Sequence, residues 1–559
     1  EETQKCDLSH LTALRRYAFD KTMLLDEATV ANLELFESQS GARKHTLYHI
    51  LNHTKTPMGA RLFRQWLRQP LLDVEAINER FDCIEEFRNN FMLCEEFREC
   101  LENIQDLPRI IGRITLPVVG VNDLVALRES LEPVQKLPTY LAELQTPLLK
   151  KIAENFDPLT DLLDLLYQRL LEAPSVKLRE GGFMAAGVSE ELDELREISR
   201  NSKQFLNEML LHEREITGIS SLKISYNKVF GYYLEVSNVH KSSVPEHYIR
   251  KQTLVNAERY ITAELKEFEE KILTAEERIG ELEYELFQQL KTEINSNARR
   301  VQQTANDIAV ADTLAGLAFV AENNHYVRPS LHPLEAPRKL FLKDSRHPVI
   351  EQIDLGEEFV PNDLDLEESK CRIMLITGPN MAGKSTYMRQ VALIVLMAQC
   401  GSFVPVSSSE FSVVDRIFTR VGASDNLTLG QSTFMLEMNE AAAILNNATE
   451  RSLIILDEIG RGTSTFDGIS IAWAIVEYIQ KLSALTLCAT HYHELTAIAQ
   501  ELDSVKNFSI RVEEEGEKIV FLRKIVSGEA DKSYGVQVAR LAGLPKSVVN
   551  RALEVMEQL

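Results

Sequence analysis

The chain has 559 residues, of which 44% are hydrophobic and 26% charged, and its formal net charge at pH 7 is −23. A chain of this length is expected to form roughly three to four domains, and its hydrophobic content can supply a core for each. The longest apolar run, Val391–Ala398, is far too short to cross a bilayer, and the opening Glu-Glu-Thr-Gln has no charged-then-apolar leader, so a membrane protein is not expected.

The seven cysteines are scattered along the chain without a C-x-x-C pair. This distribution fits reduced thiols in a cytoplasm better than a disulfide framework. Two of the cysteines, Cys371 and Cys488, fall in segments that read as core strands. We therefore expect a cytoplasmic location.

The first part of the chain, up to about residue 185, has helical periodicity that is interrupted at Pro108, Pro117 and Pro138. A helical core is the structure that this pattern predicts. The predicted helices within it are Thr46–Leu71, Asp73–Phe91, Val121–Leu131 and Asp157–Leu171.

Two long helical patterns follow, and a segment of β character separates them. Apolar residues recur alternately three and four positions apart from Leu192 to Met209 and again from Leu265 to Leu286. Between these patterns, Lys223–Asn227 and Tyr232–Ser237 read as strands. The second helix is predicted to run from Asn256 to Arg300, so that two antiparallel helices carry a small β domain.

The small β domain is locally basic although the whole chain is acidic. From Ser221 to Tyr260 there are six basic residues against three acidic ones, whereas Glu264–Glu285 carries nine glutamates against three basic residues. A basic island on an acidic body suits contact with nucleic-acid phosphates, although a random fluctuation of surface charge would give the same pattern. The candidate DNA contacts are Lys223, Asn227, Lys228, Lys241, Arg250, Lys251 and Arg259.

A phosphate-binding loop follows a linker at 327–333 and an opening segment at 346–348. The segment Gly378–Ser385 matches the pattern G-x-x-x-x-G-K-[ST] between a predicted buried strand, Arg372–Thr377, and a predicted apolar helix, Thr386–Ala398. In such a loop the backbone N–H groups and the helix N-terminus hold the phosphates, Lys384 reaches the outer phosphates and Ser385 holds Mg²⁺. The candidate nucleotide contacts in this region are Gly378, Pro379, Asn380, Met381, Ala382, Gly383, Lys384, Ser385 and Thr386.

Two later strands are predicted to complete this site. Leu453–Leu456 ends at Asp457 and Glu458; Asp457 is placed to bind Mg²⁺ or its water shell, and Glu458 to activate the attacking water. A solvated strand end would show the same pair. Leu485–Ala489 precedes His491, which we interpret as a phosphate sensor, and His493, which we place at the surface. No cysteine or carboxylate cluster completes a metal site with these histidines.

Several long strings resemble one known family. Those strings are Thr377–Gln390, Phe418–Met438, Asp457–Gly468, Thr490–Leu495, Tyr226–Ser237 and Asn256–Tyr260. They are similar to the MutS family of DNA mismatch-repair ATPases, over nearly the whole chain. Ala382 stands where Gly is frequent in the family, which is a small departure.

This resemblance implies an ABC-type ATPase that works as a dimer, with ATP or ADP and Mg²⁺ as its ligands. Ser432 would contact the nucleotide of the other subunit, Phe359 would stack on adenine, and Asn380 would touch the nucleotide. The β domain would be a clamp on duplex DNA, and the long helices would be levers that couple it to the nucleotide state. A MutL-type mediator is the expected downstream partner.

The predicted fold is therefore a multidomain α plus α/β protein: a helical core with long antiparallel lever helices, a small β clamp domain and an ABC-type P-loop ATPase domain. The predicted boundaries are 1–20 for the end of a connector, 21–203 for helical core and lever, 204–262 for the clamp, 263–330 for the second lever and return to the core, 331–530 for the ATPase and 531–559 for a helical dimerisation element.

The resemblance also implies that the family's N-terminal mismatch-reading domain and most of its connector precede the first residue of this chain. Phe97–Glu99 and Phe268–Glu270 fit the family's Phe-x-Glu reading motif, but both lie in helical patterns and are not expected to read a mispair. Two alternatives remain: an ABC transporter ATPase subunit, and a structural clamp for branched DNA in which ATP acts as a switch.

Overall fold

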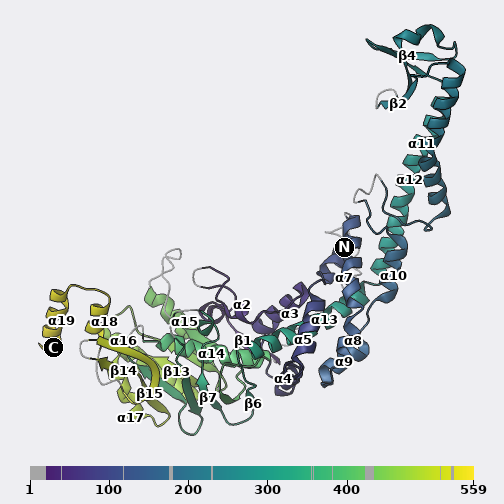
Figure 1. Cartoon of the computed structure of the whole chain (residues 1–559). Helices are drawn as coiled ribbons and strands as arrows, with labels where there is room; N and C mark the ends of the chain where they lie inside the picture. Colours follow the sequence, from purple (N-terminus) through teal and green to yellow (C-terminus); the bar gives the residue numbers. More distant parts are fainter. Residues whose placement is uncertain are drawn as a thin grey trace. The chain divides into compact units, whose positions relative to one another are not determined.

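The computed structural model describes residues 21–38, 41–116, 119–175, 181–227, 231–353, 356, 358–379, 382–421, 433–515, 518–529 and 534–558 (Figure 1). They form two compact units. Unit 1 comprises Asn103–Gln135 and Asp157–Ala305, and unit 2 comprises residues 21–102, 136–156 and 306–558. Unit 2 combines helical segments with the whole region of the phosphate-binding loop.

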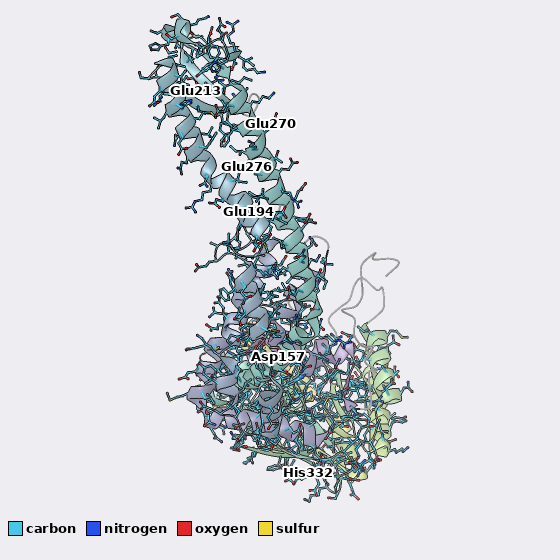
Figure 2. All side chains as sticks on the ribbon, turned by 90° about the vertical axis from the view of Figure 1, so that its right-hand side faces the viewer. Asp157, Glu194, Glu213, Glu270, Glu276 and His332 are labelled. Carbon is cyan, nitrogen blue, oxygen red and sulfur yellow. The ribbon has the colours of Figure 1, made fainter. Side chains whose placement is uncertain are left out.

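Unit 1 is built around a long helical hairpin of α11 and α12, which run side by side in Figures 1 and 2. The Ser189 side chain accepts a hydrogen bond at the N-terminus of α11, and Gly218, with φ of 65°, ends the helix in the left-handed conformation. Figure 2 shows Glu194, Glu213, Glu270 and Glu276 along the hairpin; the last two belong to the acidic run Glu264–Glu285. The described helices of this unit are α6 (Leu107–Thr115), α7 (Val121–Val134), α10 (Thr160–Arg169), α11 (Glu190–Thr217) and α12 (Ala263–Ser296).

One end of the hairpin carries an antiparallel sheet in the order β2-β3-β5-β4. Leu234 and Tyr260 of this sheet pack with Met209 of α11 and Leu265 of α12 in one buried cluster. The predicted strands Lys223–Asn227 and Tyr232–Ser237 are confirmed. The strands are β2 (Lys223–Asn227), β3 (Gly231–Ser237), β4 (Ile249–Thr253) and β5 (Ala257–Ile261), with a 3₁₀ helix η2 at Asn238–Ser243.

The single helix predicted from Asn256 to Arg300 is wrong at both ends. Ala257–Ile261 instead forms β5, which pairs with β3 and β4, and the Thr262 side chain caps the N-terminus of α12 at Leu265. Asn297 separates α12 from α13 (Ala298–Asn323). Tertiary pairing of Tyr260 and Ile261 overrides a pattern that reads as helix.

Unit 2 contains short helices in place of the long one predicted at Thr46–Leu71. Asn52 ends α2, and α3 begins at Pro57 with the Thr56 side chain as its cap, so residues 52–56 break the helix. The described helices are α1 (Glu27–Asn32), α2 (Leu47–Leu51), α3 (Pro57–Arg68), α4 (Val74–Asn89), α5 (Phe91–Leu101), α8 (Leu137–Leu141), α9 (Pro147–Asn155), α14 (Lys384–Cys400), α15 (Thr433–Asn447), α16 (Thr465–Leu482), α17 (Ile498–Glu501), α18 (Gly535–Leu541), α19 (Lys546–Gln558), and the 3₁₀ helices η3 (Ile350–Gln352) and η5 (His493–Ala497).

The main sheet of unit 2 has seven strands in the order β1-β11-β12-β13-β9-β14-β15. All neighbouring pairs are parallel except β14 with β15. The edge strand β1 comes from the segment predicted to be helical core. The strands are β1 (Leu24–Leu25), β9 (Ile373–Thr377), β11 (Arg416–Arg420), β12 (Leu453–Asp457), β13 (Leu485–Ala489), β14 (Val505–Glu515) and β15 (Lys518–Ser527).

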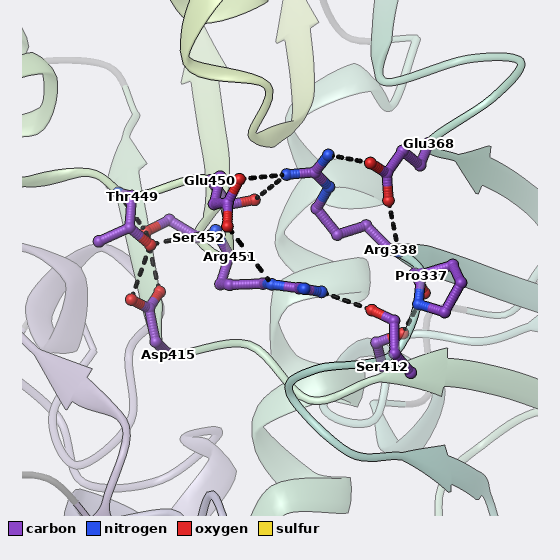
Figure 3. Close-up of polar contacts among 10 residues, drawn as sticks. Pro337, Arg338, Glu368, Ser412, Asp415, Thr449, Glu450, Arg451 and Ser452 are labelled. Atoms are coloured by element: carbon purple, nitrogen blue, oxygen red, sulfur yellow. Dashed lines mark hydrogen bonds and ion pairs between the residues drawn. The ribbon is translucent and has the colours of Figure 1, made fainter.

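A second sheet, in the order β6-β10-β7-β8, contains β6 (Ser330–His332), β7 (Lys339–Ser345), β8 (Asn362–Glu367) and β10 (Ser408–Ser412). Polar contacts join its β7 end to the turn between α15 and β12 (Figure 3). Arg338 pairs with Glu368 and, at 3.1 Å, with Glu450 of that turn. On the other side of the turn, Asp415 accepts a hydrogen bond from the Thr449 hydroxyl at 2.7 Å. The turn that leads into β12 is thus fixed from two sides.

Among the described helices, α13 is long and apolar enough to meet the criteria for a membrane span, but 83% of its most apolar window is buried inside the protein. It also holds a buried carboxylate: Asp312 accepts hydrogen bonds from the backbone N–H groups of Lys55 and Thr56, each at 2.8 Å, at the start of α3. These properties are those of a core helix of a folded domain.

Candidate functional site

The phosphate-binding loop lies between β9 and α14, as predicted, and α14 contains the predicted apolar helix Thr386–Ala398. Gly378 and Gly383 have φ of 138° and 105°, which residues with a side chain rarely adopt. The helix begins at Lys384, so its first backbone N–H groups and its positive end face the loop. Ala382 is buried beside it, and Pro379 belongs to the described part of the loop; Asn380 and Met381 lie outside the described residues.

Lys384 is held inside this loop. Its ammonium group donates to the carbonyl oxygens of Gly378 and, at 3.1 Å, of Pro379, and it lies 3.9 Å from Glu458 Oε1. Only 4% of the residue is exposed, and burial lowers its pKa, against the opposing effect of the Glu458 and Asp457 carboxylates. The Lys384 ammonium group can therefore leave these carbonyl oxygens and bind an anionic group, which is a stronger hydrogen-bond acceptor.

Asp457 lies at the end of β12 next to the start of α14. Burial raises its pKa, whereas the hydrogen bond with the Ser385 side chain lowers it. Its Oδ1 atom is buried and has no hydrogen-bond partner among the described residues. A carboxylate oxygen without a donor beside a serine hydroxyl is a donor set that fits Mg²⁺, which favours oxygen ligands and binds through few protein groups.

Glu458 follows Asp457 in a strained backbone conformation. Its φ is 58°, which is unusual for a residue other than glycine, and its N–H donates to Ala489 O of β13 at 2.9 Å. The carboxylate is 16% exposed, and its Oε2 lies 2.5 Å from the Arg461 guanidinium. β12 thus directs Asp457 into the interior and Glu458 toward Lys384 and Arg461.

His491 and His493 follow β13 and are both exposed, as predicted for His493. Partial desolvation, together with the charges of Arg461 and Lys384, lowers the pKa of His491, so its ring is neutral at pH 7. Both histidines and Arg461 line an open cavity of about 480 Å³. The ends of β9, β12 and β13 therefore bring the three predicted parts of the site to one edge of the sheet.

A second pocket of about 290 Å³ begins at the same helix N-terminus. Gly383, Thr386 and Tyr387 form one wall, and the half-buried ring of Phe359 lines the pocket with Arg523 of β15. A pocket with mixed polar and apolar lining and an aromatic ring, beside a phosphate-binding loop, has the size and lining of a site for a base.

One wall of this pocket depends on a buried histidine. His347 Nδ1 accepts hydrogen bonds from the N–H groups of Val349 and Ile350, both at 3.2 Å, and Ile350 lines the pocket. Burial, with a smaller effect of the Arg389 charge, lowers the pKa of His347 to about 3. The ring is therefore neutral, as acceptance at Nδ1 requires.

Three of the predicted DNA contacts in the β domain, Lys241, Arg250 and Arg259, are engaged in ion pairs, the last with Glu235 at 3.5 Å. Lys241 and Arg250 lie 2.5 and 3.5 Å from the Glu258 carboxylate, which is 2% exposed. Arg259 is also held: its guanidinium stacks 4.3 Å from the Tyr233 ring centroid and donates to Gln252 at 2.9 Å.

Lys223 and Lys251 are exposed on β2 and β4, and Asn227 is half-buried at the end of β2. Lys228 lies outside the described residues. Among the predicted basic residues that the structure describes, Lys223 and Lys251 are exposed to solvent. Lys241, Arg250 and Arg259 instead make contacts that also stabilise the sheet.

The sequence analysis missed several residues of the site. Arg461 sits in the string Asp457–Gly468, where a charge between two glycines marks an exposed loop beside the carboxylates. Tyr387 lies one helical turn after Lys384, so helical periodicity could have placed it. Glu437 and Tyr492, which contact Gly460, carry no local signal. Ser432, the predicted trans contact, lies outside the described residues.

Together, the parallel sheet, the glycine loop ahead of a buried helix and the carboxylates on a nearby strand define a P-loop nucleotide-binding protein. Two family models match: MutS domain III over residues 28–318 and MutS domain V over residues 374–559. The chain belongs to the MutS family.

Curated relatives agree over the full chain. Proteins named "DNA mismatch repair protein MutS" from Lachnoclostridium phytofermentans, Caldicellulosiruptor saccharolyticus and Methanosarcina mazei are 50%, 47% and 49% identical over 100% of this chain and over 60%, 65% and 62% of their own lengths. The chain thus spans less than two thirds of these relatives.

Proposed function

We propose that this chain is the core, clamp and ATPase part of an ATP-dependent DNA mismatch-repair protein, with an ABC-type ATPase that hydrolyses ATP. The observation that carries the proposal is the meeting of Lys384, Asp457 and Glu458 at one sheet edge, in a chain about half identical to proteins named for mismatch repair. ATP or ADP would lie with its phosphates on the loop and its base against Phe359.

Each residue has a distinct chemical role in this proposal. Lys384 and the backbone N–H groups at the start of α14 hold the outer phosphates and offset their charge. Glu458 accepts a proton from the attacking water, or orients it, while neutral His491 donates a hydrogen bond to the terminal phosphate. The Glu458 carboxylate is held at the site by Arg461, 2.5 Å from its Oε2 atom, and lies 3.9 Å from Lys384 through its Oε1 atom.

Ser385 and Asp457 would hold Mg²⁺, which supplies charge neutralisation at the phosphate oxygens when bound. The observation that favours this assignment is the buried Oδ1 of Asp457, which no described residue contacts by a hydrogen bond. The Ser385 hydroxyl orients the carboxylate through their hydrogen bond.

The β domain would hold duplex DNA through its basic residues, with Lys223 and Lys251 presented to solvent. The remaining proposed interactions follow the family: a homodimer in which Ser432 completes the nucleotide site of the other subunit, helices α18 and α19 as its dimerisation element, a MutL-type mediator, and a cytoplasmic, nucleoid-associated location in bacteria.

The test compares this chain with a full-length relative for binding to a G·T-mispaired duplex, its paired control and a four-way junction, at one salt concentration, with ADP and then ATP. We expect this chain to bind all duplexes in a nucleotide-dependent way, with mispair preference only in the full-length protein. No binding to any DNA would refute the clamp. Preference for the junction in the full-length protein would favour the structural clamp for branched DNA instead.

A further inference from the structure

A buried network fixes the loop that follows Glu458. The Gly460 N–H donates to Glu437 Oε1 at 2.5 Å, and the Gly460 carbonyl accepts from the Tyr492 hydroxyl at 2.8 Å. Glu437 is 2% exposed and Tyr492 8% exposed, so neither contact competes with bulk water. Both backbone polar groups of Gly460, in the two peptide units that flank its Cα, are therefore held by side chains from other parts of the chain.

The backbone of Gly460 is also confined by close packing. Its φ is 93°, and a Cβ added there would lie 2.5 Å from Gly468 O in the first turn of α16. A Cβ on Gly468 would in turn lie 2.4 Å from Gly460 O and 2.5 Å from the Tyr492 hydroxyl. The loop and the helix are thus in backbone contact, and two glycines are required to make it.

Glu437 is itself anchored. Its Oε2 lies 3.3 Å from Arg420 Nη2 at the end of β11, and Arg420 Nε lies 3.3 Å from Glu440 Oε2. Arg420 is 3% exposed. Because the second oxygen of Glu437 is engaged, its first oxygen stays directed at Gly460.

We infer that Glu437 and Tyr492 are positioning residues, which keep Glu458 in its strained conformation and so direct its carboxylate at the reacting water. Gly460 lies two residues after Glu458, and Asp457, directly before Glu458, is fixed in β12. Without the anchors at Gly460 the backbone can relax to negative φ, which turns the Glu458 side chain away. The inference rests on the proposed function, since it requires Glu458 to serve hydrolysis.

The same network connects the parts of the site along the chain. Tyr492 directly follows His491, and Glu437 lies on α15 five residues after Ser432. Motion of the proposed sensor or of the proposed trans contact would therefore reach Glu458 through the backbone of one residue, Gly460.

The test measures single-turnover ATP hydrolysis and ATP affinity for the whole chain carrying Tyr492→Phe, Glu437→Gln or Glu437→Ala. We expect Tyr492→Phe to slow hydrolysis about fivefold and Glu437→Ala at least about tenfold, with ATP affinity within about twofold of the parent. Glu437→Gln retains an oxygen that can accept the hydrogen bond of the Gly460 N–H. This variant should therefore keep most of the parent's rate of hydrolysis, unlike Glu437→Ala. The matched control is Tyr48→Phe, which removes a hydroxyl hydrogen bond to Ala60 O at 3.0 Å and leaves hydrolysis unchanged.

Each change is then combined with Glu458→Ala and the residual hydrolysis followed over hours. If the residues act by positioning Glu458, they cause no further loss in this background. An equal loss in both backgrounds, or parent-like rates for Tyr492→Phe and Glu437→Ala, overturns the inference while the proposed function stands. Parent-like hydrolysis by Glu458→Ala alone instead removes the catalytic assignment in the proposed function. Because Tyr492→Phe deletes one atom, its result is decisive even if Glu437→Ala does not fold.

Discussion

At the scale of single residues, burial sets the protonation and reach of the groups around the nucleotide site. Lys384, Asp457 and His347 are each less than a tenth exposed. Burial lowers the pKa of Lys384 and His347 and raises that of Asp457, and each change favours the neutral form. The roles of Lys384 and Asp457 could be predicted because a motif encodes them locally. The roles of Glu437 and Tyr492 could not, because their contacts with Gly460 depend on how α15 and the segment between β13 and η5 pack.

The buried His347 predicts that stability falls below neutral pH. Its pKa is about 3 when folded and near 6.5 when unfolded, so the unfolded chain binds more protons and stability falls as pH drops through 6.5. Between pH 7 and pH 5 this histidine should remove about 2 kcal/mol from the free energy of unfolding, measured by urea titration. His347→Asn, whose amide oxygen can replace Nδ1, should lose that share of the pH dependence, whereas His212→Asn at an exposed site should retain it. Equal pH dependence in all three proteins would refute the prediction.

At the scale of elements, α14 connects the phosphate-binding loop to the helical part of unit 2. Its C-terminal carbonyl at Cys400 accepts from Arg80 of α4 at 2.6 Å, and the Arg80 guanidinium lies 3.5 Å from the Trp66 ring centroid of α3. Gln399 also bonds Leu71 O at 2.9 Å. The apolar run in the sequence predicted the helix itself. It did not predict the contacts at the helix C-terminus, because no local pattern indicates a partner that is distant in the sequence.

Arg80→Ala should lower the free energy of unfolding by about 2 kcal/mol, since it removes a charged hydrogen bond and a cation–π contact. The control is Arg68→Ala, whose ion pair with Glu27 is exposed and should contribute less than about 1 kcal/mol. Urea unfolding of both variants gives the comparison. Equal losses would mean that Arg80 does not anchor α14.

In the β2-β3-β5-β4 sheet, which we propose as the DNA clamp, Lys251 and Arg259 should respond differently to substitution. Lys251→Ala should weaken duplex binding and make the slope of log affinity against log salt shallower by about 0.9, because it removes one phosphate contact. Arg259→Ala should first lower the unfolding temperature of the clamp, because its stacking on Tyr233 is lost. An unchanged salt slope for Lys251→Ala would exclude this lysine from the DNA contact.

At the scale of the whole molecule, the chain carries MutS domains III and V and spans 60–65% of the relatives' length. The sequence predicted a helical hairpin with a β tip and a P-loop domain, both confirmed, because periodicity and motif are local properties. It misplaced the start of α12, since Ala257–Ile261 acquires strand structure only by pairing with β3 and β4. It also did not predict β1 at the edge of the main sheet, because two residues are too few to form a pattern.

The proposed nucleotide site, shared between two subunits, predicts complementation between two variants that are each inactive alone. In a mixed dimer, the intact phosphate-binding loop of the Ser432→Ala subunit meets the intact Ser432 of the Lys384→Ala subunit, so one complete site forms. The second site contains both substitutions and is inactive. An equimolar mixture should recover about a quarter of parent ATP hydrolysis, since half of the dimers are mixed and each has one active site of two. A mixture no more active than its components would exclude a site shared between subunits.

The most direct test of the account is hydrolysis and binding of ATP by the chain and its Glu458→Ala variant. Glu458→Ala should bind ATP as the parent does and hydrolyse it at least about a hundredfold more slowly, because the water loses its base while the loop around Lys384 is intact. Glu501→Ala, at an exposed position of α17, serves as the control and should hydrolyse ATP normally. Turnover by Glu458→Ala equal to that of the parent would contradict the catalytic role of Glu458 and the site built around it.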